Sequence, residues 1–349
     1  MSNISNQMKH IVKWGIVGLG NIAFEFAKAF HNADNAELIA IASKTDTKIT
    51  KFKNEFKLKD ENIYNDYESI LDNKNIDIFY IALPNNLHFE WVFKAIEKKK
   101  NILVEKPAFI STKEAENIFN HKNFKNIFFS EGFMYMHHPQ ISEVIKIIKN
   151  GKIGRLIEMK TQFGINLIYK KNFLGFKTKK IDKNKRIFNK KLGGGVIFDL
   201  GCYTTSISLL IASLIENLDI SNFKIENIKT EYLESNVDIS SFAKINFEDR
   251  FHSYITASFN ENIGGHTSII GENGIINLEN SWNSEKNILR VSGKFNEEKI
   301  YQTEKNIYSL EIENISKDII ENKTESSFPG PSKKHIFLNN KLINEWIGE

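Results

Sequence analysis

The sequence predicts an α/β protein in two parts: a doubly wound parallel sheet, then an α+β domain with a large, mostly antiparallel open sheet. Three observations predict it. From residue 12 to about residue 130, short apolar runs alternate with helical periodicity, which is typical of a parallel sheet. After residue 130, strand-like runs follow one another without intervening helices, which favours an antiparallel sheet. The length of 349 residues is comfortable for two domains.

The first part, residues 12–130, follows a polar lead-in at residues 1–11 that we expect to be disordered. It opens with VKWGIV at 12–17, a short apolar run rich in strand-forming residues. Apolar residues then recur at helical spacing from Ile22 to Phe30. Further strands are expected at 37–42, 76–83, 101–104 and 126–129, and helices at 22–32, 48–57, 87–99 and 112–121.

The second part covers residues 131–349. Residues 169–191 are predicted to form a long basic loop, and a helix is expected to begin near Asp199 and end near residue 215. Other helices are expected at 138–149, 309–321 and 333–346, and strands at 155–163, 225–234, 237–247, 252–259, 266–271, 274–278 and 288–292. The consecutive strands predict an antiparallel sheet, one face of which the helices cover.

The composition excludes several classes of protein. Hydrophobic residues make up 41% and charged residues 26% of the chain, as in globular proteins. The net charge of +4 is not concentrated on one terminal arm or face, so we expect no nucleic-acid partner. The single cysteine, Cys202, excludes an intrachain disulfide and a cysteine-based zinc site and fits a reducing cytosol. No apolar run approaches the roughly 18 residues of a membrane helix, so we expect a cytoplasmic protein without a membrane partner.

Residues 18–23 read GLGNIA, which matches G-x-G-x-x-A directly after the first strand. Gly18 permits a tight turn, and Gly20 lets backbone N–H groups approach a diphosphate. Ala23 allows the helix to pack close to the sheet, and the helix N-terminus favours negative charge. Because a second strand ends about 20 residues later, the run predicts a dinucleotide site. Its first contacts are expected to be Gly18, Gly20, Asn21 and Ile22.

The residues after the second strand discriminate between the two nicotinamide cofactors. An acidic residue there would accept hydrogen bonds from the ribose 2′-hydroxyl of NAD. This chain has Ser43 and Lys44 instead, and a hydroxyl with a cation suits the 2′-phosphate of NADP. Asp46 could still turn back toward the ribose. We therefore expect NADP to be preferred, with NAD as the alternative.

Three further runs follow in order: ALPNNLH at 82–88, VEKP at 104–107 and GGGVIFDLGCY at 193–203. Together they resemble the Gfo/Idh/MocA oxidoreductases, a family that includes glucose–fructose oxidoreductase and inositol dehydrogenase. The resemblance spans nearly the whole chain and implies the two-part fold described above. Most members have His where this chain has Tyr203. The tyrosine form is similar to the subgroup of dimeric dihydrodiol dehydrogenase, NADP-dependent xylose dehydrogenase and glucose–fructose oxidoreductase.

The resemblance implies catalytic roles for Lys106, Asp199 and Tyr203. Lys106 would lie beside the nicotinamide and the reacting oxygen, Tyr203 would be the general acid/base, and Asp199 would orient the substrate. Lys106 would also lower the pKa of Tyr203, since an unperturbed phenol with a pKa near ~10 is a poor base at neutral pH. Asp199 and Tyr203 lie four residues apart in a predicted helix and so share a face. The residues expected to edge the cofactor are Leu83, Pro84, Asn85, His88, Glu105, Lys106 and Pro107, of which His88 packs rather than reacts.

The substrate candidates come from two further segments. The run EGFMYMHHPQ at 131–140 also resembles the subgroup, but Met136 stands where its members usually have Arg, so Tyr135 and His137 are second-rank candidates. The basic segment 169–191 holds ten basic residues and one acidic residue. A solvated loop is favoured over a segment that steers an anionic sugar, and Arg186 is the best candidate if the second interpretation holds. We expect no metal.

The leading hypothesis is an NAD(P)-dependent dehydrogenase or reductase acting on a sugar or polyol at a secondary alcohol or hemiacetal carbon. One alternative is an NAD-linked nucleotide-sugar dehydrogenase of surface-polysaccharide synthesis, which the basic segment favours and Tyr203 disfavours. Another is a non-catalytic dinucleotide sensor, which the retained Lys106, Asp199 and Tyr203 disfavour. By resemblance, the open second sheet predicts a homodimer or homotetramer.

Overall fold

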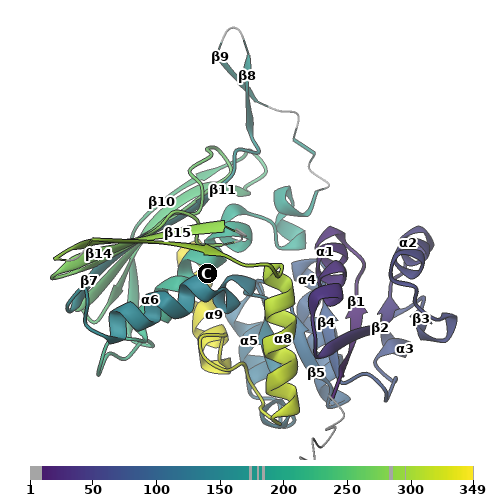
Figure 1. Ribbon diagram of the computed structural model, residues 1–349. Helices are drawn as coiled ribbons and strands as arrows, with labels where there is room; N and C mark the ends of the chain where they lie inside the picture. Colours follow the sequence, from purple (N-terminus) through teal and green to yellow (C-terminus); the bar gives the residue numbers. More distant parts are fainter. Residues whose placement is uncertain are drawn as a thin grey trace, which may run out of the picture.

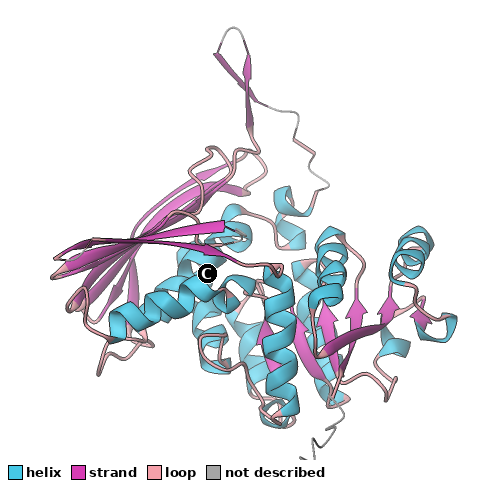
Figure 2. Ribbon diagram, in the orientation of Figure 1, coloured by secondary structure: helices cyan, strands magenta, loops and turns pink. Residues whose placement is uncertain are grey.

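The computed structural model describes residues 10–172, 175–178, 181–182, 185–282, 286–294 and 296–348. Most of the expected disordered lead-in therefore lies outside the described residues. Figure 1 shows a sheet enclosed by helices at one end of the molecule and a broad, twisted sheet at the other. Figure 2 shows that helices cover only one face of the broad sheet. The predicted fold class is confirmed.

The first sheet is parallel throughout and has the strand order β3-β2-β1-β4-β5-β6. Its strands are apolar because helices cover both faces, and β4 is buried at all four positions. The strand order reverses between β1 and β4, where a doubly wound sheet binds its ligand. The strands are β1 (Val12–Val17), β2 (Ala36–Ala42), β3 (Ile63–Tyr64), β4 (Ile78–Ile81), β5 (Asn101–Val104) and β6 (Phe129–Glu131).

The helices of this part include every one that the periodicity predicted. They are α1 (Asn21–Ala29), α2 (Asp46–Phe56), α3 (Tyr67–Ile70), α4 (Asn85–Glu97) and α5 (Thr112–Phe119). The sequence patterns did not predict β3 and α3, because two to four residues are too short to show a period. Strand β6 begins three residues later than the start predicted at 126, since Phe124–Asn126 forms a 3-10 turn.

The second sheet has the order β10-β11-β12-β7-β13-β14-β15-β16. All neighbours are antiparallel except β12 and β7, which run parallel. Its strands alternate buried and partly exposed residues, as one covered face requires. The strands are β7 (Leu156–Gly164), β10 (Phe223–Tyr232), β11 (Asp238–Phe247), β12 (Phe251–Ser258), β13 (Thr267–Gly271), β14 (Gly274–Leu278), β15 (Lys286–Gly293) and β16 (Glu297–Gln302).

Helices α6 (Pro139–Lys149), α7 (Cys202–Ala212) and α9 (Lys333–Ile347) belong to this part, and α7 lies against β7, β12 and α9. A π-helical turn, Ile197–Gly201, precedes α7 at the place where the sequence predicted the helix to begin. Such turns occur often at functional sites. Residues 190–212 form the one described helical stretch whose length and composition would suit a membrane span. Because 89% of its apolar window is buried in the fold, it is accounted for as a core helix, although the sequence predicted no such run.

One sequence expectation for this part was wrong, and one strand was missed. Residues 169–191 are not a single loop, because β8 (Tyr169–Asn172) and β9 (Gly175–Thr178) pair as an antiparallel hairpin that projects from the body in Figure 1. Short 3-10 turns follow at Arg186–Phe188 and Lys190–Leu192. The edge strand β16 was not predicted, because its charged sequence EEKIYQ has few apolar residues.

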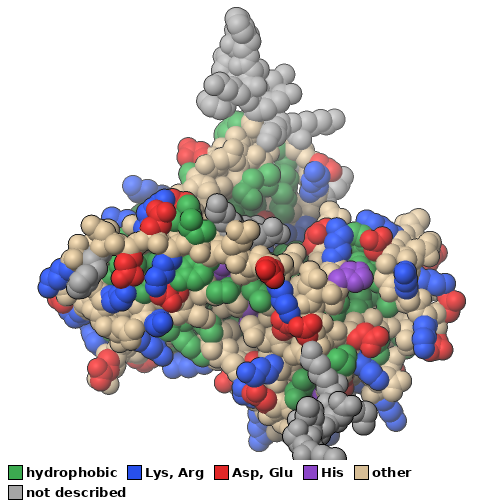
Figure 3. All heavy atoms as spheres, viewed as in Figure 1, with side chains coloured by type: hydrophobic (Ala, Val, Ile, Leu, Met, Phe, Trp, Pro, Cys, Tyr) green, Lys and Arg blue, Asp and Glu red, His purple; other side chains and the backbone are tan. Residues whose placement is uncertain are grey.

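Helix α8 (Ile307–Ile320) returns to the first sheet although it is late in the chain. The Ser309 hydroxyl donates to the Ala29 carbonyl at 2.8 Å, and the Trp14 indole N–H donates to the Ser316 hydroxyl at 3.0 Å. The domain boundary at residue 130 therefore stays a prediction. In the folded protein, α8 packs against the first sheet although it follows that boundary in the sequence. On the face in Figure 3, acidic and basic side chains are interspersed.

Candidate active site

Several of the predicted site residues meet at the carboxyl edge of the parallel sheet, around a cavity of about 250 Å³. The strand order of the sheet reverses between β1 and β4. Ligands of doubly wound sheets bind at the carboxyl edge beside this point. Residues from the first motif to α8 contribute. The lining consists of Ile22, Leu83, Asn85, Glu105, Lys106, Gly132, Met134, Arg186, Tyr203 and Tyr308.

The GLGNIA turn fits the diphosphate of a dinucleotide. Gly18 has φ of +94°, and a Cβ there would lie 2.7 Å from the Ala82 carbonyl oxygen, so the turn needs glycine. Gly20 is the N-cap of α1, and a Cβ built on it would meet nothing within 4 Å. No side chain caps the first turn of α1 and no acidic residue lies in it. The N–H groups of this turn therefore suit an anion.

The end of β2 carries no carboxylate at residues 43–45. Ser43 is buried, and its hydroxyl accepts from the Thr45 N–H at 3.2 Å. Lys44 is exposed, with its ammonium 5.3 Å from the centroid of the Tyr67 ring. Asp46 opens α2. An exposed cation and the absence of a carboxylate at these three residues suit a 2′-phosphate better than a ribose 2′-hydroxyl.

Asp199 binds two cations at the centre of the site. The Arg186 guanidinium donates to Asp199 Oδ1 at 2.6 Å. The Lys106 ammonium donates to the Asp199 backbone oxygen at 2.7 Å and lies 3.7 Å from Oδ1. Burial opposes ionisation of Asp199, but Lys106 and Arg186 together hold its pKa below the usual value. Asp199 thus fixes both cations at the cavity, and its role in orienting substrate stays a prediction.

Tyr203 lies one turn after Asp199, with its ring beneath the Lys106 ammonium. The ammonium is 4.8 Å from the ring centroid, while the phenol O–H points to Met134 Sδ at 3.6 Å. Burial, followed by the nearby Tyr308, raises the pKa of Tyr203 well above its usual value. The expectation that Lys106 lowers this pKa is wrong for this arrangement, because the cation faces the ring and not the oxygen. Tyr203 is therefore protonated at neutral pH.

Aromatic rings enclose Tyr203 on the side away from the first sheet. Phe163, Trp282 and Tyr135 lie 5.4, 5.6 and 6.0 Å from it between ring centroids. Tyr135 is fully buried and hydrogen-bonds to the Ser206 hydroxyl at 3.0 Å. Tyr135 therefore packs among the aromatic rings behind Tyr203 and does not line the cavity. This placement differs from its prediction as a substrate contact.

His137 also lies outside the active-site cavity. Its Nδ1 is 3.2 Å from the Asn314 amide nitrogen, and it lines a separate cavity of about 250 Å³ with Asp318 and Phe328. The neighbouring His138 is buried, and its Nδ1 accepts from the Gln140 N–H at the start of α6. Neither histidine is a substrate contact in this arrangement. Within the described ranges, no group of three His, Cys, Asp or Glu side chains is placed to hold a metal ion.

His88 joins two segments that edge the cofactor site. Its Nδ1 lies 2.9 Å from the Pro107 carbonyl oxygen, and its Nε2 lies 2.8 Å from that of Leu83. The ring is fully buried, and burial lowers its pKa to about 4. Pro84 is the N-cap of α4, and the next residue, Asn85, donates to the Gly193 carbonyl at 2.8 Å. The packing role predicted for His88 agrees with this placement.

Two carboxyl groups lie near Lys106: Glu105, which is half-buried and lines the cavity, and Glu131, which is buried. The Tyr80 hydroxyl donates to Glu105, which also accepts from the Lys106 N–H at 3.2 Å. Glu131 accepts from the Ala108 N–H at 2.8 Å, and burial raises its pKa to about 8. Both bonds hold the E-K-P loop against the sheet. Sequence reasoning missed Gly132, Met134 and Tyr308, and for Tyr308 the only signal was its place just after the helix-capping Asn306.

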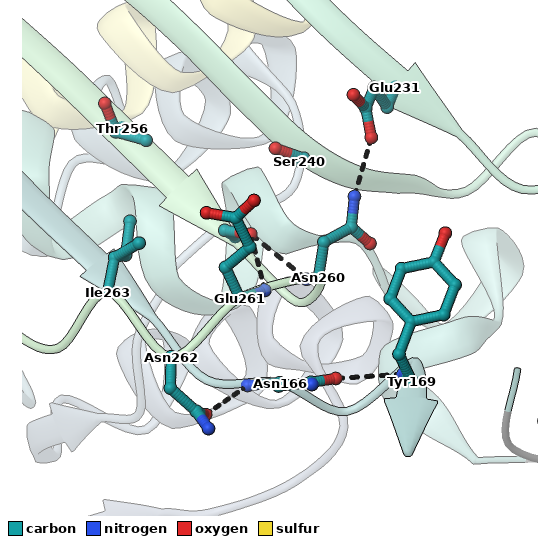
Figure 4. A pocket seen from close by; sticks show the side chains of 10 residues that line it. Asn166, Tyr169, Glu231, Ser240, Thr256, Asn260, Glu261, Asn262 and Ile263 are labelled. Atoms are coloured by element: carbon teal, nitrogen blue, oxygen red, sulfur yellow. Dashed lines mark hydrogen bonds between the residues drawn. The ribbon is translucent and has the colours of Figure 1, made fainter. Parts of the chain in front are cut away.

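A larger cavity lies elsewhere, a hollow of about 760 Å³ beside the base of the β8–β9 hairpin. Figure 4 shows its polar side chains turned toward one another, with the Asn260 amide donating to Glu231 at 2.6 Å and the Asn166 N–H donating to Asn262 at 2.7 Å. None of the predicted site residues lines it. The cavity of greater volume therefore does not coincide with the cluster of cations, carboxylates and phenols.

The fold and the site define a two-part oxidoreductase with a Rossmann domain. Residues 12–133 match the family described as "Oxidoreductase family, NAD-binding Rossmann fold", and residues 141–277 match the "GFO/IDH/MocA C-terminal domain". The chain belongs to the Gfo/Idh/MocA family, so the resemblance seen in its motifs is confirmed.

Among curated relatives, dTDP-3,4-didehydro-2,6-dideoxy-alpha-D-glucose 3-reductase of Saccharopolyspora spinosa is 27% identical over 56% of this chain and 54% of its own. Trans-1,2-dihydrobenzene-1,2-diol dehydrogenase of Xenopus tropicalis is 23% identical over 81% of this chain and 79% of its own. D-xylose 1-dehydrogenase (NADP(+)) of Hypocrea jecorina is 28% identical over 56% and 51%. The matches thus span about half the length of the first and third of these relatives.

Solved structures share the fold over nearly the whole chain. The aldose-aldose oxidoreductase of Caulobacter crescentus superposes with a TM-score of 0.82 at 18% identity, covering 97% of each chain. KijD10, a 3-ketoreductase from Actinomadura kijaniata solved in complex with NADP and TDP-benzene, gives 0.80 at 18% identity and covers 96% of this chain and 96% of its own. At this identity, the likeness shows the fold alone.

Proposed function

We propose that this protein transfers hydride between a nicotinamide dinucleotide, NADP in preference to NAD, and a secondary alcohol or hemiacetal carbon of a sugar or polyol. The observation that carries the proposal is that Lys106 and Tyr203 line one cavity together with Ile22 of the GLGNIA run, while Asp199 holds Lys106 from behind. The names of the xylose and dihydrodiol dehydrogenases among its relatives support the same reaction class.

The residues present fit the cofactor. The first turn of α1 would hold the diphosphate, Ser43 and Lys44 the 2′-phosphate, and the segments joined by His88 would flank the nicotinamide. When bound, the dinucleotide supplies the hydride chemistry, and the chain supplies geometry and proton transfer.

Tyr203 and Lys106 divide the work at the substrate oxygen. In the direction of reduction, the Tyr203 O–H bond breaks and its proton passes to the oxygen that gains charge as the carbonyl carbon accepts hydride. Lys106 stabilises that charge electrostatically. In oxidation, Tyr203 must first release its own proton to solvent, and the phenolate oxygen then takes the alcohol proton. Because burial keeps Tyr203 protonated, the residues are set for the acid step of reduction.

A substrate panel tests the proposal. We would follow NADPH and NADH formation with free, phosphorylated and nucleotide-linked sugars, and their consumption with the corresponding keto sugars. The expected result is turnover of at least one free sugar or polyol with a higher kcat/KM for NADP than for NAD. Tight dinucleotide binding without turnover anywhere in the panel would refute the catalytic proposal and favour a sensor.

One observation favours a second candidate, a nucleotide-sugar oxidoreductase. Arg186 lines the cavity, and its Nη1 is buried with no hydrogen-bond partner in the described part of the chain. Arg186 donates to Asp199 through Nη2, so Nη1 can donate a hydrogen bond to a phosphate oxygen. Turnover confined to the nucleotide-linked or phosphorylated members of the panel, and lost in Arg186→Gln, would select this candidate.

We also propose that the protein is cytoplasmic and forms a homodimer or homotetramer through the second sheet. The sheet leaves apolar side chains exposed, among them Ile228, Tyr232 and Ile300. An isologous contact between two copies would cover such a face. Light scattering coupled to size exclusion gives the mass directly, and a single species of 40.3 kDa would contradict the proposed assembly.

A further inference from the structure

Tyr308 forms part of the wall of the active-site cavity, although no sequence motif contains it. It is the second residue of α8, and its N–H donates to the side chain of the N-cap residue Asn306 at 2.8 Å. Its ring lines the same cavity as Lys106 and Tyr203. A residue more than a hundred positions beyond Tyr203 thus contributes to the space in which the reaction would occur.

The position of the Tyr308 ring is fixed by the packing of α8. The ring meets Phe26 edge-to-face with 6.1 Å between centroids, and Phe26 in turn stacks on Tyr80 at 3.9 Å. The next residue, Ser309, bonds to the Ala29 carbonyl at 2.8 Å. Because these contacts hold both the helix and the ring, the side chain is placed before a ligand binds, which lowers the entropic cost of a contact.

The hydroxyl of Tyr308 is available to a ligand. Within the described ranges, no group hydrogen-bonds to it, whereas its own N–H is satisfied. Burial, followed by Glu105 and Glu311, raises the pKa of Tyr308, so the hydroxyl keeps its proton and can donate. Tyr308 and Tyr203 both line the same cavity of about 250 Å³.

We propose that Tyr308 is a specificity residue whose hydroxyl donates a hydrogen bond to the substrate oxygen next to the reacting oxygen. This inference rests on the proposed function, in which Tyr203 and Lys106 take the reacting oxygen. Two phenols lining one small cavity suit two oxygens on adjacent carbons. The site would therefore select vicinal diols and α-hydroxy carbonyl groups, such as D-glucose carries at its first two carbons, over simple alcohols.

The discrimination has a physical basis. A group that hydrogen-bonds a substrate hydroxyl is left unpaired in a buried site when the substrate lacks that hydroxyl. For one neutral hydrogen bond the expected effect is about tenfold in kcat/KM. Removal of the Tyr308 hydroxyl removes both the hydrogen bond to the substrate and the cost of leaving that hydroxyl unpaired. The ratio of kcat/KM between the two substrates should therefore fall to about one, in addition to any loss of rate.

The test compares D-glucose with 2-deoxy-D-glucose in the wild-type protein, in Tyr308→Phe and in the control Tyr301→Phe, which alters a phenol on β16 outside the cavity. We expect the wild type and Tyr301→Phe to prefer D-glucose about tenfold in kcat/KM, and Tyr308→Phe to show a ratio near one, mainly through loss of activity on D-glucose. The Kd of each sugar, titrated against the NADPH complex by nicotinamide fluorescence, provides the same ratio without turnover.

Three results would overturn the assignment. One is an unchanged ratio in Tyr308→Phe, and another is equal loss on both sugars, which would mean a structural role. The third is a raised Kd for NADPH with the sugar ratio intact, which would make Tyr308 a cofactor contact. Lack of wild-type turnover across the whole panel would instead refute the proposed function, and the sugar Kd ratio would still decide the role of Tyr308.

Discussion

Replacement of Asp199 by Asn tests whether one buried carboxylate organises the site. The side chain is 16% exposed and holds Arg186 at 2.6 Å and Lys106 at 3.7 Å. The Asn amide oxygen can still accept one hydrogen bond, and Lys106 keeps its bond to the backbone oxygen of residue 199. The loss of stability should therefore be smaller than when one partner of a buried ion pair is removed completely. A charged hydrogen bond contributes roughly 1.5–3 kcal/mol, and we expect Asp199→Asn to lower the free energy of unfolding by about this amount.

The same change should lower kcat/KM by about 10- to 100-fold, because both cations lose the charge that holds them at the cavity. Urea denaturation gives the stability, and initial rates at several substrate concentrations give kcat and KM. Asp219→Asn is the control, since Asp219 is an exposed carboxylate that accepts from Ser221 far from the site, and it should leave kcat/KM unchanged. Asp199→Asn with wild-type stability and kcat/KM would refute the reasoning.

The difference in the free energy of unfolding between the wild type and Asp199→Asn should depend on pH in one direction. The folded-state pKa of Asp199 lies below the ordinary value of 3.8, so its contribution to stability is fully present above that value. The contribution is lost as the pH falls through the lowered folded-state pKa. The stability curves of the wild type and Asp199→Asn should therefore converge only in strong acid, and a constant gap at all pH values would contradict the ionised state of Asp199.

The remaining predictions concern the cofactor site and its supports. Lys44→Ala should lower the NADP-to-NAD ratio of kcat/KM about tenfold, measured by initial rates, while an unchanged ratio would exclude Lys44 from the 2′-phosphate. The neutral His88 ring donates one N–H, to the carbonyl of either Leu83 or Pro107, so His88→Leu should cost about 1–3 kcal/mol in urea denaturation and raise the Kd of NADPH; His88→Gln should lose less. The pKa of Glu131 is raised from 4.5 to about 8, so its contribution to stability is full below 4.5 and is lost as the pH rises through 8. Glu131→Gln should flatten that decline, and an equal decline in both proteins would contradict it.

The parts of the fold predicted from sequence are those with a repeated local signal. Strands β1 and β2 and helices α1 and α4 show apolar runs or helical periodicity long enough to be unambiguous. The parallel pairing of β12 with β7 could not be predicted, because their partners lie about a hundred residues apart and nothing local records the register. The return of α8 to the first sheet has the same origin, since its amphipathic pattern does not say which surface it covers.

At the site, the motifs predicted which residues meet but not how their atoms face one another. Lys106 and Tyr203 do meet, yet the ammonium lies over the ring and the phenol O–H donates to Met134 Sδ, and burial is the main cause that raises the pKa of Tyr203. Tyr135 and His137 lie in the predicted segment but point into the aromatic wall and a separate cavity. A shift of one residue along a 3-10 turn changes the direction of a side chain, and short sequence runs carry no record of that direction.

The most direct test of the central claim is to measure turnover and cofactor binding together in Tyr203→Phe. The change removes one oxygen and keeps the ring that packs under Lys106, so the Kd of NADPH should stay within about twofold of the wild-type value. Loss of the proton donor should lower kcat by about 100-fold or more on the best sugar of the panel. Tyr254→Phe, on a strand of the second sheet outside the cavity, should match the wild type in both measurements. Wild-type kcat in Tyr203→Phe would contradict the account.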